Sequence, residues 1–301
     1  MRGSRATTVA AFTALVLAVA GCSSDDDRNT DDENTDDRTT EEVVEELYPD
    51  RPGGMGWSAA WNDPRGFTEA DPSDPWFVTE GSGTYEAAEG RLAVSGAAPR
   101  MYVRDPALRR QWRNVEITTY FMRRADAGVP YAGMTAVART NHGMTGSVEE
   151  DLCDSRGYGA RMRYDGMVDF EKETAHPENE AAAGTVLWPD GMPADVWLGY
   201  KFVVYDLPDG AVKLELYLDD SPGGGDWRLV NELVDDGDVF GDVPCAEGID
   251  PMMPLTGSPD RPGSESGLPN LSVYFRSDGV SDQGLLYQRV SVREITTPAQ
   301  E

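Results

Sequence analysis

The sequence predicts an all-β protein whose folded part is a single β-sandwich. From Tyr85 onward, short apolar runs alternate with turns rich in Gly, Pro, Asp and Asn, which is the pattern of short strands joined by tight connections. Beyond the N-terminal segment no stretch has sustained helical periodicity, apart from a short turn around residues 41–47. No internal repeat or linker divides the remaining chain, and about 250 residues can form one sandwich.

The N-terminus, MRGSRATTVAAFTALVLAVAGC, joins a basic start to an apolar run from Val9 to Ala20. This run is shorter than the about 20 apolar residues that cross a bilayer, so residues 1–21 are expected to be a signal peptide. Residues 19–22 resemble a bacterial lipobox, which implies a lipid on Cys22 and an extracytoplasmic domain anchored to the cell membrane or outer membrane. The alternative is an ordinary signal peptide with an incidental cysteine.

Residues 22–50 are acidic and nearly free of large apolar side chains before Val43. Such a segment cannot bury enough surface to offset the entropy of ordering it, so we expect a disordered tether. The sandwich is then expected over residues 51–297, followed by a short tail at 298–301.

The net charge of the chain is −28, and the 13 acidic and two basic residues between Asp25 and Asp50 account for only −11 of it. The sandwich itself is therefore acidic. Because phosphate binding requires a basic surface, this balance argues against nucleic acid as a partner. It also disfavours a highly anionic ligand unless arginines converge or a cation bridges.

Apart from Cys22 the chain has two cysteines, Cys153 and Cys245. An exported protein meets an oxidising environment, where a lone pair of cysteines usually forms a disulfide. We therefore expect a Cys153–Cys245 bridge, with two free thiols as the alternative. No CxxC or Cys/His cluster indicates zinc.

Hairpins are expected where paired runs flank two-residue turns. Residues 84–96 turn at Glu89-Gly90 and residues 160–173 turn at Asp165-Gly166. The clearest pair is residues 197–220, in which alternate apolar residues define one face of each strand. These residues are Leu198, Tyr200, Phe202, Val204, Val212, Leu214, Leu216 and Leu218. Further strands are expected at residues 114–124, 133–143, 271–279 and 285–295.

Three segments together resemble the concanavalin A-like jelly-roll superfamily: the hairpin GTYEAAEGRLAVSG, the run PRMYVRDPALRRQWRNVEITTYFMR and the closing strand VSVREI. That superfamily contains lectins, laminin-G-type modules, family 16 glycanases and several polysaccharide lyases. The resemblance spans most of residues 81–295 and implies a jelly-roll β-sandwich with its ligand on the concave face of one sheet. It rests on strand order and turn placement, and a fold does not define a chemistry.

Asp169, Glu171 and Glu173 occupy alternate positions of one strand and therefore point to one face. Their spacing is similar to the Glu-x-Asp-x-Glu strand of family 16 glycanases. That resemblance implies that Asp169 and Glu173 are nucleophile and acid/base, with Glu171 assisting. The Asp in the first position and the flanking residues depart from the pattern. The alternative is a solvent-facing acidic edge.

A second group of candidates centres on His142. A lyase acting on a uronate needs a base, an acid and a group that neutralises the carboxylate, and His142, Tyr158 or Tyr164, and Arg139 have that chemistry. The strand motifs of alginate-lyase-like families are missing. The alternative is a hydrogen-bonded histidine at a strand end, with arginines that pair surplus carboxylates. The other candidates of this group are Asn141, Arg161 and Arg163.

A two-residue turn at Asp165-Gly166 would determine which side chains share each face of its hairpin. One face would carry Met162, Tyr164, Met167, Asp169 and Glu171, and the other would carry Arg161, Arg163, Val168, Phe170 and Lys172. Such mixed faces suit a groove lined by polar groups, or an edge hairpin covered by a loop.

Lys201 lies opposite the apolar face of its strand, beside aromatic residues. This arrangement suits a sugar-binding surface or a cross-strand pair with Glu215 equally well. Asp235, Asp236 and Asp238 around a glycine turn are candidate Ca²⁺ ligands because Ca²⁺ prefers oxygen. Their spacing is not that of an EF-hand, and a solvated acidic turn is the alternative.

The sequence therefore predicts a surface lipoprotein whose jelly-roll domain binds a polysaccharide or other glycan in a groove between residues 139–142 and 161–173. One alternative is a polysaccharide-degrading enzyme in the same groove, either a lyase using His142 and Tyr158 or a glycoside hydrolase using Asp169 and Glu173. A second alternative is an envelope domain that contacts only other proteins. In each case the membrane is expected to be reached only through the lipid.

Overall fold

The computed structural model describes residues 45–125, 128–144, 152–241, 243–256 and 270–297. Within these ranges the chain forms strands, turns and loops, and none of its segments is a helix that could span a membrane. The predicted signal peptide, Cys22, most of the predicted tether and the tail at 298–301 lie outside the described residues.

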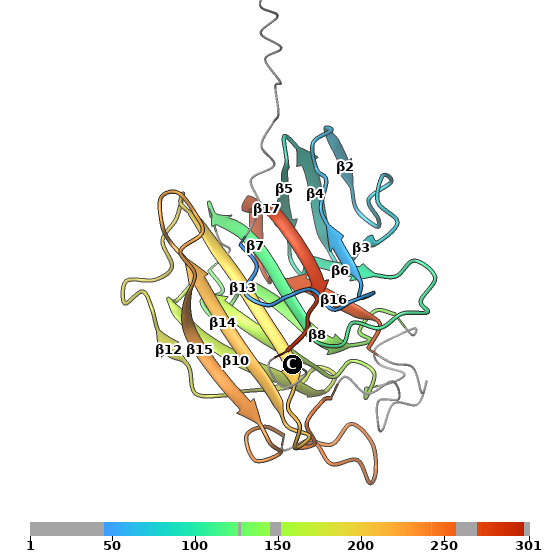
Figure 1. Cartoon of the computed structure of the whole chain (residues 1–301). Coiled ribbons are helices and arrows are strands. Elements are labelled where there is room, and N and C mark those ends of the chain that lie inside the picture. Colours follow the sequence, from blue (N-terminus) through green and yellow to red (C-terminus); the bar gives the residue numbers. More distant parts are fainter. Residues whose placement is uncertain (1–44, 126–127, 145–151, 242, 257–269, 298–301) are drawn as a thin grey trace, which may run out of the picture. The chain divides into compact units, whose positions relative to one another are not determined.

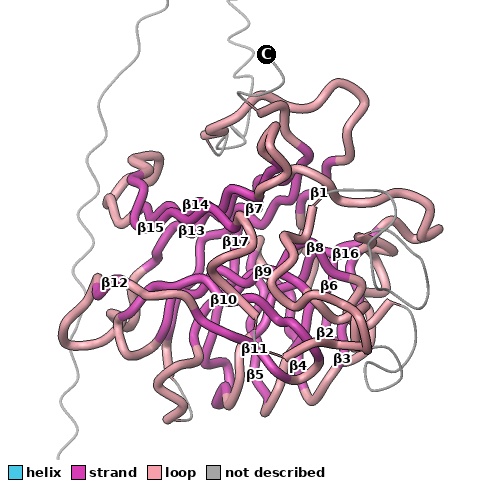
Figure 2. The backbone as a smooth tube through the Cα atoms, turned by 90° about the horizontal axis from the view of Figure 1, so that it is seen from below, coloured by secondary structure: helices cyan, strands magenta, loops and turns pink. Residues whose placement is uncertain are grey.

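Two antiparallel sheets stack face to face (Figure 1, Figure 2). The nine-stranded sheet runs in the spatial order β15 (Arg228–Asp235), β14 (Val212–Asp219), β13 (Trp197–Asp206), β7 (Val115–Arg123), β17 (Val280–Glu294), β5 (Arg91–Gly96), β4 (Gly83–Ala88) and β2 (Arg65–Phe67), with β1 (Gly56–Ser58) paired to β17. The eight-stranded sheet runs β11 (Glu178–Ala181), β10 (Met167–Ala175), β9 (Gly157–Arg163), β8 (Gly133–Thr140), β16 (Ser272–Arg276), β6 (Arg100–Arg104) and β3 (Phe77–Glu80), with β12 (Thr185–Val186) paired to β10. Strands far apart in sequence are neighbours, as β7 and β17 are, and the domain is a jelly-roll β-sandwich as predicted.

The core lies between the sheets and takes every second residue of their central strands. In the hairpin of β13 and β14, Tyr200 pairs with Leu218 and Phe202 with Leu216, and all four side chains are buried in the main cluster. The predicted apolar face of this hairpin is therefore confirmed. The β4–β5 hairpin also turns at Glu89-Gly90 as predicted, since Ala88 pairs with Arg91.

The opposite faces of the sheets have their own small clusters. On the eight-stranded sheet, Tyr102, Val137 and Tyr274 pack together separately from the main core. Because neighbouring residues of a strand point to opposite sides and Met101 and Val103 belong to the main core, this second cluster lies on the side facing away from the other sheet. We call this side the outer face of the eight-stranded sheet.

The chain enters the fold on the outer face of the nine-stranded sheet. The backbone N–H groups of Leu47 and Tyr48 donate to the carboxylate of Glu116, and Lys201 Nζ donates to the carbonyl of Glu45 at 2.9 Å. Residues 45–50 thus contact the sandwich, so the folded part begins before residue 51, where the composition had placed its boundary.

The predicted disulfide is confirmed. Cys153 and Cys245 are bonded, with their Cα atoms 5.1 Å apart, and they join the turn before β9 to the segment after β15. That segment also contributes Phe240 and Leu255 to the main core. The bridge therefore fastens the long connection between β15 and β16 to the turn before β9.

Removing the bridge in the double variant Cys153→Ser/Cys245→Ser should lower the free energy of unfolding by about 2–5 kcal/mol. The reason is that the bridge spans 92 residues and restricts the unfolded chain. Thermal unfolding with and without a reductant measures this effect. The reductant should bring the wild-type midpoint down to that of the double variant and leave the variant unchanged. A wild-type unfolding midpoint that is the same with and without the reductant would contradict the prediction.

Candidate functional site

Charged side chains gather on the outer face of the eight-stranded sheet, over β9 and β10. Asp169 pairs with Arg161, Glu171 with Gly159, and Glu173 with Gly157 in the ladder. Gly159 leaves space for the side chain of Glu171, since a Cβ on Gly159 would lie 2.8 Å from it. The second glycine of the Gly-Tyr-Gly sequence in β9 thus makes room for the central carboxylate of β10.

The sequence-based register of this hairpin was wrong by one residue. Val168 pairs with Met162 and Asp169 with Arg161, so three residues, Tyr164 to Gly166, form the turn instead of two. Gly166 has a φ of +87°, and a Cβ there would lie 1.9 Å from the carbonyl oxygen of Trp188. A shift of one residue exchanges the faces of one strand. Arg161 and Arg163 therefore share a face with Asp169 and Glu171 instead of opposing them.

Asp169 is held by two arginines and is only 2% exposed. Arg161 donates to both of its carboxylate oxygens at 2.5 and 2.7 Å, and Arg163 donates to Oδ2 at 2.9 Å. A carboxylate enclosed in this way cannot reach the anomeric carbon of a sugar, which the nucleophile of a retaining hydrolase must do. The geometry therefore argues against the predicted hydrolase role of Asp169.

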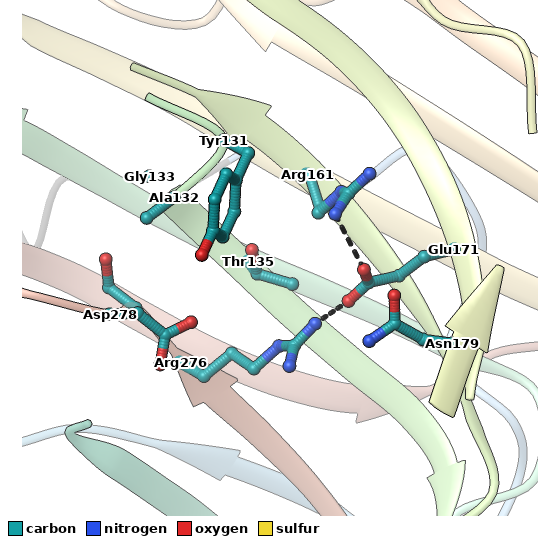
Figure 3. A pocket seen from close by; sticks show the side chains of 10 residues that line it. Tyr131, Ala132, Gly133, Thr135, Arg161, Glu171, Asn179, Arg276 and Asp278 are labelled. Carbon is teal, nitrogen blue, oxygen red and sulfur yellow. Dashed lines mark ion pairs between the residues drawn. The ribbon is translucent and has the colours of Figure 1, made fainter. Parts of the chain in front are cut away.

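A pocket of about 130 Å³ opens on this face between β8, β9, β10 and β16 (Figure 3). Figure 3 shows the ring of Tyr131 and the carboxylate of Glu171 on opposite sides, with Thr135 between them. Glu171 is paired with Arg161 at 2.8 Å and with Arg276. The remaining lining residues are Ala132, Gly133, Asn179, Ser277 and Asp278.

The arginines of this face are close enough for the charge of one to lower the pKa of another. Burial and the neighbouring charges of Arg100 and Arg161 lower the pKa of Arg276 to about 10. Arg276 is therefore still a cation at neutral pH. It shares the region with a second ion pair, in which Arg100 lies 2.9 Å from Asp278.

His142 lies on the same outer face, in the turn that follows β8. Its Nδ1 is 2.7 Å from the hydroxyl of Tyr102, and its ring lies against those of Tyr102, Tyr274 and His176 with centroids 5.9, 5.1 and 5.5 Å away. Burial and the charge of Glu80 raise the pKa of Tyr102, so the phenol remains protonated at neutral pH. The Nδ1 of His176 is 2.8 Å from Oε1 of Glu173. This group thus contains one predicted carboxylate and both histidines of the chain.

Arg139 and Asn141 do not belong to this face, which corrects their assignment as ligand-binding residues. Simple alternation would place Arg139 outward with Val137, but the β8–β16 register shifts there and Arg139 has a φ of +62°. The bulge turns its fully buried guanidinium inward, where it donates to Asp206 at 2.8 Å and to Asn114 at 3.0 Å. Asn141 is also fully buried and accepts the N–H of Leu271. Both residues support the structure.

Tyr158 and Asp235 lie between the sheets, which excludes the predicted acid of a lyase and weakens the predicted Ca²⁺ site. The hydroxyl of Tyr158 donates to Asp235, and Lys172 Nζ lies 2.9 Å from the same carboxylate. Burial, followed by the charge of Asp235, raises the pKa of Tyr158 well above its usual value. Asp236 and Asp238 are exposed while Asp235 is buried, so the three acids do not face one site.

Lys201 lies on the nine-stranded sheet and therefore does not belong to the outer face of the eight-stranded sheet. It is fully buried, 2.6 Å from Glu116 and 4.6 Å from the centroid of the Trp227 ring. The expected partner, Glu215, instead accepts hydrogen bonds from Tyr48 and Tyr205. Lys201 is therefore a structural cation under the N-terminal segment.

Sequence reasoning missed Tyr102, Tyr131, Tyr274 and Arg276. The signal for Tyr102, Tyr274 and Arg276 was available, because Arg100, Tyr102 and Arg104 alternate with apolar residues in β6, and Tyr274 and Arg276 do so in β16. However, these residues lie near the histidines only because β6 pairs with β16 and β16 pairs with β8. For Tyr131, in the loop before β8, the sequence carries no comparable pattern.

The domain is an antiparallel jelly-roll β-sandwich, as its strand order shows. No protein-family model and no curated protein matches the sequence. The VIP36 exoplasmic/lumenal domain in its Ca²⁺/Man3GlcNAc-bound form is similar, with a TM-score of 0.44, 10% identity, and coverage of 80% of this chain and 92% of that one.

Two further solved structures are similar to a comparable degree. A legume lectin-like domain from Entamoeba histolytica has a TM-score of 0.40 and 9% identity, covering 77% of this chain and 97% of that chain. An endo-β-1,4-glucuronan lyase from Trichoderma reesei has a TM-score of 0.40 and 11% identity, covering 76% of this chain and 94% of that chain. These likenesses concern the path of the chain, and they do not indicate which ligand this protein binds.

The variant Arg139→Met should destabilise the protein by about 3–5 kcal/mol, because it leaves buried partners of the guanidinium without their cation. Arg228→Met is the matched control. Its pair with Asp220 is half exposed on the surface, where an ion pair contributes about 0–1 kcal/mol. Urea unfolding midpoints measure both effects. Equal midpoints for the two variants would contradict a structural role for Arg139.

Proposed function

We propose that the domain binds a glycan on the outer face of the eight-stranded sheet, with the pocket beside Tyr131 as the subsite for one sugar unit. The observation that carries this proposal is the side chain of Tyr131, which is 58% exposed at the edge of a pocket lined by hydrogen-bonding groups. An exposed aromatic ring offers its face to the C–H groups of a sugar.

The rest of the pocket suits the hydroxyl groups of a sugar. Glu171 offers carboxylate oxygens, Arg161 and Arg276 offer guanidinium N–H groups, and Asn179 and Thr135 offer an amide and a hydroxyl. Small-ligand sites combine an apolar or aromatic wall with a few placed polar groups in this way. The ion pairs also hold Glu171 in place, so little side-chain freedom would be lost on binding.

The charges favour an uncharged sugar. Of the arginines near the pocket, Arg100 is paired with Asp278, Arg161 with Asp169 and Arg276 with Glu171. Each cation is therefore already matched, and a uronate would bring an uncompensated charge to an acidic protein. The volume of about 130 Å³ is well below the about 300–1,000 Å³ of pockets for drug-sized ligands. This size suits one unit of a longer chain.

The proposed setting is the outside of the cell. The predicted signal peptide and the lipobox-like residues before Cys22 support export and lipid anchoring. A lipid anchor keeps a binding domain at the surface, where polysaccharides of the envelope or the surroundings are met.

A second candidate function is elimination on a uronate-containing polymer, and one contact favours it. The hydroxyl of Tyr102 and Nδ1 of His142 are 2.7 Å apart, and a phenol in contact with an imidazole is a pair suited to proton transfer. Tyr102 takes the place that Tyr158 held in the sequence-based lyase hypothesis.

A panel of neutral and uronate-containing polysaccharides tests these functions with the full chain. Tyr131→Ala should weaken binding of the best polymer at least tenfold, which corresponds to about 1.4 kcal/mol. Tyr131→Phe should retain binding, because the ring face is kept. Leu229→Ala, a change at an exposed apolar side chain of β15 on the other sheet, is the control.

Two outcomes would decide against neutral-glycan binding. If Tyr131→Ala binds as well as the wild type, the pocket is not the subsite. If the wild type cuts a uronate polymer to give new reducing ends together with unsaturated uronate at the new non-reducing ends, and Tyr102→Phe abolishes both, the protein is a lyase. Co-sedimentation measures binding, and a reducing-end assay measures cleavage.

A further inference from the structure

We infer that His142, Glu173 and His176 form a binding site for a divalent transition metal ion of the zinc type. One ligand atom of each of the three residues lies within 4.8 Å of those of the other two. This site is separate from the glycan pocket, and the inference does not depend on glycan binding.

One ligand lies in a strand of the eight-stranded sheet and the other two lie in turns directly beside its strands. Glu173 lies in β10, where it pairs with Gly157 of β9 and Asn179 of β11. His176 follows directly after β10, at the turn into β11. His142 is held by its backbone N–H, which donates to Oγ1 of Thr140 at 3.0 Å. Ligands fixed by strands and short turns lose little entropy when they bind an ion.

A second layer of contacts orients His142 toward the other two ligands. The Nδ1 of its ring lies 2.7 Å from the hydroxyl of Tyr102, which is fully buried. Metal-binding histidines characteristically use one ring nitrogen for such a partner and the other for the ion. With Nδ1 bonded to Tyr102, Nε2 is the ligand atom of His142. Tyr102 is therefore a positioning residue.

The donor set indicates which ion is preferred. Two imidazole nitrogens and one carboxylate suit Zn²⁺ and its neighbours Cu²⁺, Ni²⁺ and Co²⁺, whereas Ca²⁺ and Mg²⁺ prefer sites made only of oxygen atoms. Three protein ligands leave a tetrahedral ion with one further position for water or another ligand. The site therefore resembles an open metal site more than a closed structural one.

The position of the site connects it with the outer face. Glu173 lies two residues after Glu171 on the same side of β10, about 7 Å further along the strand. An ion at Glu173 would thus add a positive charge next to the pocket on an otherwise acidic molecule.

The test is a zinc titration of the full chain after treatment with a chelator, measured by calorimetry. We expect one equivalent to bind, and His142→Gln, His176→Gln and Glu173→Gln each to weaken that binding at least tenfold. Tyr102→Phe should weaken it about 10–100-fold, as loss of an orienting partner does. Glu178→Gln is the control, because this exposed carboxylate of β11 lies nearby but outside the cluster.

A second measurement locates the ion. The chain has two histidines, so zinc should shift the ring proton resonances of both in the NMR spectrum, while Ca²⁺ should shift neither. Thermal unfolding of each variant shows whether the fold is kept. Absence of zinc binding in the wild type, or equal zinc binding by the folded double variant His142→Gln/His176→Gln, would overturn the inference. If no polysaccharide of the panel binds, the inference of a metal site is unaffected, because the titration contains no glycan.

Discussion

The ion pair between Lys172 and Asp235 joins the two sheets through the core and orients the face that carries the site. Lys172 belongs to β10 of one sheet and Asp235 to β15 of the other, and both side chains are fully buried. Lys172 Nζ also donates to the carbonyls of Met252 and Met253. With Lys172 pointing inward, its neighbours Glu171 and Glu173 must point outward. The polar interior thus determines which carboxylates lie on the outer face of the eight-stranded sheet.

A buried cation is expensive unless its hydrogen-bonding capacity is satisfied, and this interior satisfies it with backbone groups. Arg139 and Lys172 both donate to carbonyls of the segment after β15, and Tyr158 accepts the N–H of Leu255 from the same segment. The Cys153–Cys245 bridge fastens this segment covalently. The long connection is therefore bound to the sandwich by polar contacts as well as by Phe240 and Leu255.

The sequence predicted the fold class, the disulfide and the long hairpins, because each has a local signature. In the β13–β14 pair every second residue from Leu198 to Val204 is apolar, and the two cysteines of a chain that was predicted to be exported have one possible partner each. The strands β1, β2, β3, β11 and β12 were not predicted because they have two to four residues, too few for a periodic pattern. β15 was missed since its exposed and half-buried residues do not alternate cleanly.

The site was only partly predictable, for reasons of register and pairing. Asp169, Glu171 and Glu173 were placed on the correct strand, whereas His142 lies in the turn just after β8, the strand that was predicted to contain it. A three-residue turn and the bulge at Arg139 each reversed the direction of neighbouring side chains. Both features depend on tertiary contacts, such as the approach of Trp188 to Gly166. Tyr102 and Arg276 reach the site through strand neighbours that are far away in the sequence. No local rule could have brought these residues together.

The attachment of residues 45–50 to the nine-stranded sheet gives the domain a front and a back. The polypeptide enters on the back, where Glu45 and Tyr48 contact Lys201 and Glu215. The pocket and the histidines occupy the front, on the outer side of the opposite sheet. A glycan bound as proposed would therefore lie on the side of the sandwich opposite to residues 45–50, so those residues would not restrict whether the middle or the end of a polymer is bound.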